Sequence, residues 1–272
     1  MKSRVAIIAG AGRFPFHVAQ EAKRQGLTVV AMGIQGWVDS TLASQVDAYE
    51  EIAVGQLGRF VERLKSHRIR QAIMAGKVTK EVLLDQGTAF DDDARRILQH
   101  AREFSVPTLL GAIGRRLARE GIVLLDSSTF LKAHLCPRGV LTSRPPTAGE
   151  AQDIEVGVQA ARALAALDIG QTVVVKRRVV VALEALEGTD AAIRRGAALA
   201  GQGVVVVKMA SANQDRRWDL PVVGTDTISA LREAGGACLA VEAKMTLLLD
   251  RPVLMAAANA AGLSLVGVSP LS

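Results

Sequence analysis

A short apolar run, a glycine turn and a helix near the start of the sequence constrain the fold most. Val5 to Ala9 has the pattern of a buried strand, and Gly10-Ala11-Gly12-Arg13 follows it as a turn. Pro15 suits the first turn of a helix, which ends at Gly26 before a second strand at Thr28 to Met32. This order of strand, helix and strand predicts a Rossmann-like parallel sheet with a ligand beside the glycine turn.

The glycine turn matches only part of the dinucleotide-binding fingerprint. Its third glycine is missing, and Gly33-Ile34-Gln35 after the second strand offers no acidic side chain for a ribose. We therefore do not expect NAD, and we predict instead that Gly10, Gly12 and Arg13 contact the substrate. A nucleotide-dependent enzyme that uses the Gly10 turn is the alternative.

A second glycine turn follows a later strand of the same predicted sheet. Tyr49 to Val54 and Gln71 to Met74 read as the third and fourth strands, separated by an amphipathic helix. Gly76 and Lys77 follow the fourth strand, and a glycine and a lysine at the carboxyl end of a strand suit an anion. We predict that both contact the substrate; a plain strand end with a surface lysine is the alternative.

Three consecutive acidic residues, Asp91-Asp92-Asp93, precede a further helix. Negative charge at the N-terminus of a helix is favoured by the helix dipole. The dipole accounts for these residues, so we assign them no metal.

A segment rich in serine and proline divides the chain. Residues 126–147 contain Ser127-Ser128 and Pro145-Pro146, which is typical of a linker. We place an N-terminal Rossmann-like domain at residues 1–132 and a distinct C-terminal α/β catalytic domain at residues 133–272. The expected fold class is α/β, with two domains.

Two polar turns in the C-terminal half each follow a β-branched run. The first follows Val179 to Leu183, and its Gly188 permits a tight turn before Thr189 or Asp190 caps a short helix. The first-turn amides of such a helix favour an anion. Asp190 and Arg194 are four residues apart on one helix face, so an ordinary N-cap with an ion pair is the alternative.

The second polar turn, Gln214 to Thr227, contains three carboxylates, two guanidiniums and one tryptophan between two apolar elements. It follows Gly203 to Met209, a buried-strand pattern that includes Lys208. Loops after buried strands are where α/β folds keep their chemistry. A solvated loop with a few salt bridges is the alternative. Together, however, the two turns can supply carboxylates for a divalent metal and cations for a phosphate.

Composition and charge limit the partners. The 272 residues carry a net charge of +6 spread along the chain, which favours phosphates or an acidic membrane surface. Aromatic residues make up only 3%, so platforms that stack nucleic-acid bases are not expected. Two cysteines without metal-type spacing and four scattered histidines predict no histidine or cysteine metal centre and fit the cytoplasm. No apolar run is long enough to span a bilayer.

The polar turns resemble those of a known family. In order and with the right spacing, the matching residues are Asp168-Ile169-Gly170-Gln171, Glu184, Glu187-Gly188-Thr189-Asp190, Arg194-Arg195, Lys208, Gln214-Asp215-Arg216, Trp218-Asp219-Leu220-Pro221 and Gly224. Together they resemble the UDP-2,3-diacylglucosamine pyrophosphatases of the LpxI type. The N-terminal half matches more loosely, through Ile8-Ala9-Gly10, Gly55 with Gly58, and Ala75-Gly76 with Val78.

The resemblance implies an enzyme that holds its substrate between a Rossmann-like domain and an α/β domain. It implies hydrolysis of a pyrophosphate to UMP and a diacylglucosamine 1-phosphate, on the route to lipid A, with a divalent metal such as Mg²⁺. It also places the essential aspartate of the family at Asp219. Ser105-Val106-Pro107 stands where the resemblance leads us to expect Gly-Asp-Asp, so we expect a substrate or metal contact of the N-terminal domain to differ, which leaves the reaction class standing and the exact substrate open. A non-catalytic protein that binds a nucleotide or a phospholipid is the other interpretation.

The chemistry then assigns roles to the polar side chains. A pyrophosphate repels a nucleophile, so its hydrolysis needs neutralised charge and a positioned water. Asp219 is expected to bind the metal or to orient that water, with Asp190 and Glu187 as further candidate ligands for Mg²⁺ or Mn²⁺. Further substrate contacts are expected from Thr189, Arg194, Lys208 and Arg216.

The implied substrate carries acyl chains, although no segment of the chain is expected to span a bilayer. We therefore expect a peripheral, charge-assisted attachment to the anionic surface of the inner membrane from the cytoplasm. The lipid-linked UDP-sugar is the expected small-molecule partner. The sequence leaves open whether the protein forms a homodimer.

Overall fold

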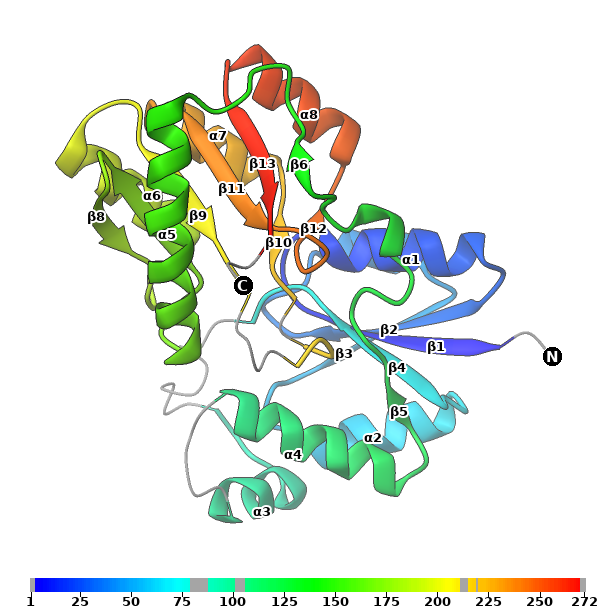
Figure 1. Ribbon diagram of the computed structural model, residues 1–272. Coiled ribbons are helices and arrows are strands. Elements are labelled where there is room, and N and C mark those ends of the chain that lie inside the picture. The colour runs from blue at the N-terminus through cyan, green and yellow to red at the C-terminus, as the bar shows by residue number, and fades with distance from the viewer. Residues whose placement is uncertain (1–2, 79–87, 101–105, 211–214, 219, 270–272) are drawn as a thin grey trace. The chain divides into compact units, whose positions relative to one another are not determined.

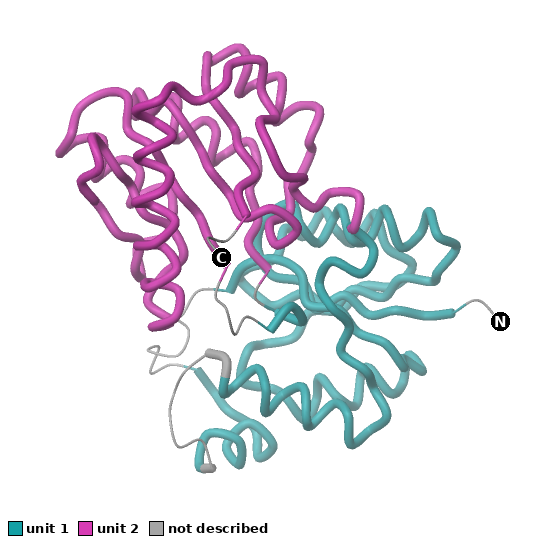
Figure 2. The backbone as a smooth tube through the Cα atoms, viewed as in Figure 1, with its two compact units in different colours: residues 1–131, 215–219 teal, residues 132–214, 220–272 magenta. Residues whose placement is uncertain are grey.

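The computed structural model describes residues 3–78, 88–100, 106–210, 215–218 and 220–269 (Figure 1). The chain divides into two compact units (Figure 2). The N-terminal unit is Met1–Leu131 with Asp215–Asp219, and the C-terminal unit is Lys132–Gln214 with Leu220–Ser272. Within the described ranges, no helix combines the length and the apolar character needed to cross a membrane.

The N-terminal unit alternates strands and helices. Its elements are β1 (Arg4–Ala9), α1 (Phe14–Arg24), β2 (Thr28–Ile34), the 3-10 helix Ser40–Gln45, β3 (Ala48–Ile52), α2 (Leu57–Ser66), β4 (Gln71–Ala75), α3 (Asp92–His100), α4 (Val106–Arg119) and β5 (Val123–Leu124). The five strands pair in parallel in the order β3-β2-β1-β4-β5, which confirms the predicted Rossmann-like sheet.

Helices cover both faces of this sheet, which explains why its central strands read as continuous apolar runs. On one face, Phe60 and Leu64 of α2 and Leu117 of α4 pack with Ala6 and Met32. Figure 1 shows α1 on the opposite face. The strand order reverses between β1 and β4, so the loops after these two strands lie at the point where open α/β sheets bind ligands.

The C-terminal unit is a second, distinct α/β structure. Its elements are the 3-10 helix Lys132–His134, β6 (Gly139–Val140), α5 (Ala148–Ala166), β7 (Thr172–Lys176), β8 (Val179–Leu183), α6 (Thr189–Ala200), β9 (Val205–Lys208), β10 (Val222–Val223), α7 (Thr225–Glu233), β11 (Cys238–Glu242), β12 (Leu247–Leu248), α8 (Arg251–Ala260) and β13 (Ser264–Val268).

The main sheet of this unit is mixed, with the order β6-β13-β11-β9-β7-β8, and β10 pairs separately with β12. β13, β11 and β9 are parallel, whereas β6 and β7 run antiparallel to their neighbours. β8 is antiparallel to β7 in turn, so the carboxyl end of β8 returns to the edge where β9 ends. α5 packs on one face with Val173 and Val205, and α6, α7 and α8 pack on the other with Val174 and Val206.

Candidate functional site

Two predicted ligand turns meet at the carboxyl edge of the N-terminal sheet. The turns after β1 and β4 are joined by backbone hydrogen bonds: the Gly10 N–H donates to the Ala75 carbonyl at 2.8 Å. Ala11 and Lys77 each donate an N–H to the other's carbonyl at 2.9 Å. These three amides therefore hold the two turns together rather than offering donors to a phosphate.

Gly10 and Gly76 are needed because the two turns touch. A β-carbon on Gly76 would lie 2.6 Å from the carbonyl carbon of Gly10, and one on Gly10 would lie 2.7 Å from the carbonyl oxygen of Lys77. Gly76 also has φ +95°, where side chains are disfavoured. Gly12 has a similar φ of +91°, but a β-carbon there would meet no atom of the described residues within 4 Å. Open space therefore lies beside Gly12, not between Gly10 and Gly76.

Arg13, also a predicted substrate contact, is the exposed N-cap residue of α1. Its guanidinium lies 5.5 Å from the ring centroid of Phe16, one turn along the helix. The structure thus groups Arg13 with the predicted glycine turns at one edge of the sheet.

A short segment from the C-terminal half of the sequence packs in the N-terminal unit. Residues 215–218, which we call the returning segment, belong to this unit. Trp218 is half-buried against the apolar cluster of α2 and α4. The returning segment lies within residues 133–272, which we assigned to the C-terminal domain, but its packing groups it with the N-terminal unit, because its tryptophan finds apolar partners there.

Ser127 holds the returning segment through both its backbone and its side chain. Its N–H donates to the Arg216 carbonyl at 2.8 Å, and its hydroxyl lies 2.9 Å from the carbonyls of Arg217 and Met74. The sequence predicts a linker here, yet Ser127 is only 1% exposed. The difference arises because polar atoms of Ser127 find partners on distant parts of the chain, which composition does not reveal.

The two arginines of the returning segment have partners within the unit. Arg216 Nη2 donates to the Ser128 hydroxyl at 2.8 Å. Its Nε lies 2.9 Å from an Asp126 oxygen, as an ion pair without hydrogen-bond alignment. Arg217 forms an ion pair with Asp215, and its hydrogen bond holds the pKa of Asp215 below the ordinary value. Arg216, a predicted phosphate ligand, is therefore already oriented by a carboxylate and a hydroxyl.

A polar cluster of four residues lies at the carboxyl edge of the C-terminal sheet. Lys208 ends β9, Thr172 begins β7 opposite it, and Glu184 follows β8. Thr189, the first residue of α6, lies at the centre. Its hydroxyl accepts a hydrogen bond from Lys208 Nζ at 2.8 Å and donates one to Glu184 Oε1 at 2.8 Å, with the Thr172 hydroxyl 3.3 Å away. The structure thus brings the predicted residues Thr189 and Lys208 together.

Glu184 and Thr172 are the two members of the polar cluster to which the sequence assigned no role, and Glu184 is the charged one. Burial by itself raises the pKa of Glu184, and the positive charge of Lys208 opposes this. Hydrogen bonds to the carboxylate act in the same direction as the lysine, and they come from Thr172, Thr189 and the Gln171 amide. The net pKa lies below its ordinary value, so Glu184 is ionised at neutral pH. Glu184 directly follows β8, and Lys208 is the last residue of β9. This shared position at a strand end is the sequence signal that could have identified Glu184.

The other predicted residues of this turn are not part of the polar cluster. Glu187 is exposed and accepts hydrogen bonds from Arg195 at 2.6 Å and from the Ala185 amide at 3.1 Å; the Arg195 bond is the main cause of its lowered pKa. Both Asp190 and Arg194 are described, and they do not form the ion pair that their spacing offers. Arg194 lines a shallow hollow of about 380 Å³ between α6 and α7.

The expected metal ligands are only partly visible. Among the described residues, no three His, Cys, Asp or Glu side chains come close enough together to hold a metal ion. Asp219, the expected catalytic residue, lies outside the described residues, as does Ser105.

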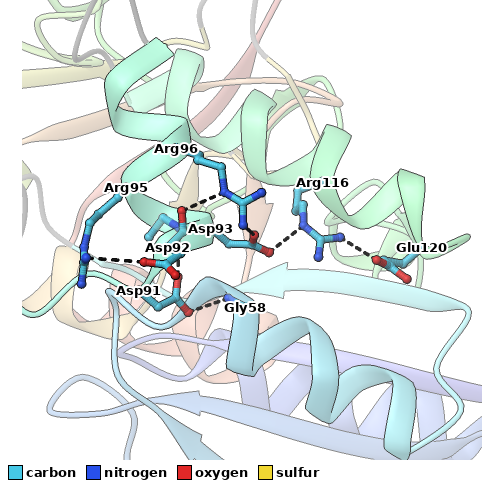
Figure 3. A network of polar contacts seen from close by, with 9 residues as sticks. Gly58, Asp91, Asp92, Asp93, Arg95, Arg96, Arg116 and Glu120 are labelled. Atoms are coloured by element: carbon cyan, nitrogen blue, oxygen red, sulfur yellow. Dashed lines mark hydrogen bonds and ion pairs between the residues drawn. The ribbon is translucent and has the colours of Figure 1, made fainter.

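The acidic run at the start of α3 has protein partners (Figure 3). Asp91 accepts hydrogen bonds from the amides of Gly58 at 2.7 Å and Ala94 at 2.9 Å. Asp93 forms an ion pair with Arg116 at 2.8 Å. These contacts tie α3 to α2 and α4, so the run serves the fold.

Comparisons with known proteins identify a family that the chain matches. Residues 4–134 match the family described as "LpxI N-terminal domain", and residues 137–266 match "LpxI C-terminal domain". The chain is 30% identical, over 98% of both chains, to a protein from Caulobacter vibrioides named UDP-2,3-diacylglucosamine pyrophosphatase LpxI.

Similarity to solved structures is weak. A biotin carboxylase domain of a thermophilic 2-oxoglutarate carboxylase gives a TM-score of 0.27 at 14% identity, over 64% of this chain and 35% of that one. A structure described as CobK precorrin-6A reductase gives a TM-score of 0.29 at 11% identity, over 99% of this chain and 89% of that one. Both TM-scores are too low to indicate a shared fold.

Proposed function

Because the chain belongs to the LpxI family, we propose that it hydrolyses UDP-2,3-diacylglucosamine to UMP and 2,3-diacylglucosamine 1-phosphate. One observation carries this proposal: both family domains match in order, and the named relative is similar over 98% of both chains. The reaction breaks one phosphoanhydride bond. The oxygen of a water molecule joins one phosphorus, and the other phosphate leaves.

The polar cluster offers positive charge for the pyrophosphate. An ammonium has three N–H donors, and Lys208 uses one of them for the Thr189 hydroxyl. Because Thr189 also begins α6, Lys208 lies beside the N-terminus of a 12-residue helix, where backbone amides favour an anion. We assign Lys208 and Thr189 to the phosphates of the substrate, with Arg194 and Arg216 as further candidates.

Glu184 orders the donors and acceptors of the cluster. Thr189 has one hydroxyl proton and donates it to Glu184. The oxygen of Thr189 is then left to accept from Lys208, which holds the ammonium at the edge of the sheet. Because its pKa is lowered, Glu184 is ionised at neutral pH. The hydrogen bonds from Thr189 to Glu184 and from Lys208 to Thr189 are therefore favoured at the pH at which the enzyme would work.

The carboxyl edge of the N-terminal sheet offers a second substrate surface. We assign Gly12 and Arg13 to direct contact, because the space beside Gly12 is open and Arg13 is exposed. Gly10 and Gly76 shape the adjoining turns, and Lys77 adds a cation to them. A substrate that bears a diphosphate suits such a surface. Its negative charge is stabilised by cations and by backbone that can approach the phosphates closely.

We propose Asp219 as the residue that orients the attacking water or binds Mg²⁺. Mg²⁺ often takes one or two carboxylates and keeps waters and substrate phosphates in the rest of its shell, so one or two carboxylates would suffice to hold it. Asp219 would hold the ion with Asp190 or Glu187, and the ion would neutralise charge on the pyrophosphate. Glu187 would first have to release Arg195.

The acyl chains of this substrate require contact with a lipid surface. We propose peripheral attachment to an anionic membrane, supported by the net charge of +6. Binding to vesicles with acidic lipids should weaken as salt rises, because salt screens exposed charges.

A direct assay tests the proposed reaction. Purified protein is incubated with UDP-2,3-diacylglucosamine in Mg²⁺ or in EDTA, and UMP and the lipid product are quantified. We expect both products in equal amounts with Mg²⁺ and a large loss of turnover in EDTA. A folded protein that releases no UMP would overturn the proposed function, whereas full turnover in EDTA would overturn only the metal requirement.

A further inference from the structure

The loop after β2 returns to α1 and brings a carboxylate with it. β1 and β2 are adjacent parallel strands, so the loops that follow them leave the sheet at the same edge. Trp37 and Val38 donate their N–H groups to the Ile34 carbonyl, at 3.0 and 3.2 Å, and this turn reverses the chain. Asp39 follows the turn and caps the 3-10 helix Ser40–Gln45, which contacts α1. An acidic side chain is therefore present beside α1, although the residues directly after β2 include none.

Only one of the two carboxylate oxygens of Asp39 is used by the fold. Its Oδ1 accepts hydrogen bonds from the N–H of Thr41 at 2.9 Å and from the Thr41 hydroxyl at 2.7 Å. These hydrogen bonds are the main cause of the lowered pKa of Asp39, and the positive charge of Arg13 lowers it further. Within the described residues, Oδ2 has no hydrogen-bond partner, and it can accept from the hydroxyl groups of a ligand.

The N-terminus of α1 offers donors for an anion at the same edge. Arg13 is the N-cap residue of this 11-residue helix, and no side chain of the described residues caps the helix. The first amides of a helix lack partners within it and favour an anion. The space beside Gly12 is open, and Arg13 is exposed. Groups that bind an anion therefore lie close to Asp39, whose charge is sensitive to Arg13.

An anion site and a carboxylate in these positions suit a nucleotide. In nucleotide-binding sheets of this type, the phosphate lies at the N-terminus of the helix after the first strand, and an acidic side chain beyond the second strand accepts a hydrogen bond from the ribose. We propose that Oδ2 of Asp39 accepts a hydrogen bond from the ribose 2′-hydroxyl of the uridine nucleotide, while Arg13 and the N-terminus of α1 contact its phosphate. This deepens the proposed function and rests on it for the identity of the nucleotide.

One substitution separates ribose binding from the structural role of Asp39 as a helix cap. Serine caps a helix about as well as aspartate does. Its single oxygen can accept from the Thr41 amide, as Oδ1 of Asp39 does, but serine has no second oxygen for a ribose. Asp39→Ser should therefore keep the melting temperature of the wild type and lose only the contact that we assign to Oδ2.

Calorimetric titration of the full chain with UMP and with 2′-deoxy-UMP tests the contact directly, because these nucleotides differ by one hydroxyl. A hydrogen bond to a charged group changes an affinity about 10- to 100-fold. The wild type should therefore bind UMP at least about tenfold more tightly than 2′-deoxy-UMP, and Asp39→Ser should bind both with Kd values within about threefold of each other.

Two further variants control for charge. Asp92→Ser, at an aspartate of the same unit whose side chain is 84% exposed, should keep the wild-type preference for UMP. Arg13→Met should weaken the binding of both nucleotides by a similar factor, because the phosphate is common to them, and should leave the preference intact. The two parts of the proposed contact are thereby measured separately.

Loss of the preference in Asp39→Ser, at an unchanged melting temperature, supports the proposal. A preference that persists in Asp39→Ser overturns it, because the ribose is then recognised elsewhere. A wild type that binds neither nucleotide, or binds both equally, overturns it as well. The titration needs no turnover, so it is independent of the proposed reaction. A wild type that prefers UMP but releases none from UDP-2,3-diacylglucosamine contradicts the proposed function and supports the contact of Asp39 with the ribose.

Discussion

The two sheets of this chain end in carboxyl edges that are built in different ways. In the N-terminal sheet, the turns after β1 and β4 are joined backbone to backbone, and Gly10 and Gly76 leave no room for side chains between them. In the C-terminal sheet, the strand ends are joined by side chains, with Thr189 between Lys208 and Glu184. Close backbone packing therefore holds the N-terminal edge together, and hydrogen bonds between charged and polar side chains hold the C-terminal edge together.

This difference separates what a substitution does at each edge. A new side chain between two touching backbones must push them apart, so damage at the N-terminal edge falls on folding. A changed side chain in the polar cluster leaves the backbone in place but unbalances its charges, so damage there falls on binding and on the pH dependence of stability. Variants at each edge, each compared with a matched control, test this difference.

The largest effect is expected from Gly76→Ala. The new methyl group would clash with the Gly10 backbone at 2.6 Å and occupy φ +95°, so the free energy of unfolding should fall by about 3 kcal/mol. Gly12→Ala is the matched control, because it has φ +91° and open space around it. It should cost only about 1 kcal/mol of left-handed strain. Equal losses in urea denaturation would contradict the claim that contact, not φ, explains Gly76.

Asp219→Asn tests whether the chemistry depends on the aspartate that follows the returning segment in the sequence. The amide keeps the shape but removes charge and basicity, so kcat should fall at least about 100-fold while the melting temperature stays unchanged. Substrate affinity should survive better than rate, because the loss falls on the transition state. Asp92→Asn, at an aspartate whose side chain is 84% exposed, is the control. Near-normal turnover of Asp219→Asn at saturating Mg²⁺ would falsify the assignment.

Lys208→Met tests the charge-determined edge. A charge-assisted hydrogen bond to a phosphate is worth about 1.5–3 kcal/mol, so KM should rise about tenfold or more while the fold persists. Lys132→Met, at an exposed lysine of the same unit, should leave KM unchanged. An unchanged KM in Lys208→Met would remove the polar cluster from the substrate site.

The same variant has a consequence for pH, through Glu184. In the wild type, the folded pKa of Glu184 lies below its ordinary value of 4.5, so its carboxylate adds stability above that pH. This contribution is lost as pH falls through the folded pKa. Without the positive charge of Lys208, the effect of burial on Glu184 is less opposed, so the pKa of Glu184 in the folded state rises. The stability gap between wild type and Lys208→Met should therefore narrow from pH 7 to about pH 4 in urea denaturation. A constant gap would show that the two charges do not interact.

The smallest effect is expected from Glu187→Gln. This carboxylate pairs with Arg195 near the surface, where the two side chains are 32% and 50% exposed, so its loss should cost less than about 1 kcal/mol. The concentration of Mg²⁺ needed for half-maximal turnover should not change, because Arg195 and the Ala185 amide already occupy the carboxylate. A several-fold rise in that concentration would instead make Glu187 a metal ligand.

Much of the fold can be predicted from the sequence, because strands, helices and turns depend on residues that are close together in the chain. The run from Val5 to Ala9 and the glycine turn after it predict a strand of a parallel sheet, and the structure confirms both. Lys208 and Thr189 could be predicted to meet, because strand ends and helix starts gather at one edge of a sheet. Their contact at 2.8 Å supports this reasoning.

Long-range contacts account for what the sequence did not predict. Ser127 resembles a linker serine in composition, and only its hydrogen bonds to Met74 and Arg217 show that it is buried. Trp218 is flanked by charged residues, so no periodicity indicates that it joins the core of a sheet formed by a much earlier part of the chain. Glu184 was missed for a related reason: its role depends on Lys208 at the end of β9, which is the next strand after β8 in the sequence but is separated from β8 in the sheet by β7.

The returning segment also means that the boundary at residue 131 is not a place to divide the protein. Trp218 belongs to the C-terminal family domain by sequence, at residues 137–266, but to the N-terminal unit by packing. A fragment ending at Leu131 would expose the apolar seat of an indole that it does not contain, and the complementary fragment would carry that indole with nothing to cover it. The two halves are therefore not exchangeable modules, and any recombination between relatives must carry Ser127 and Trp218 together.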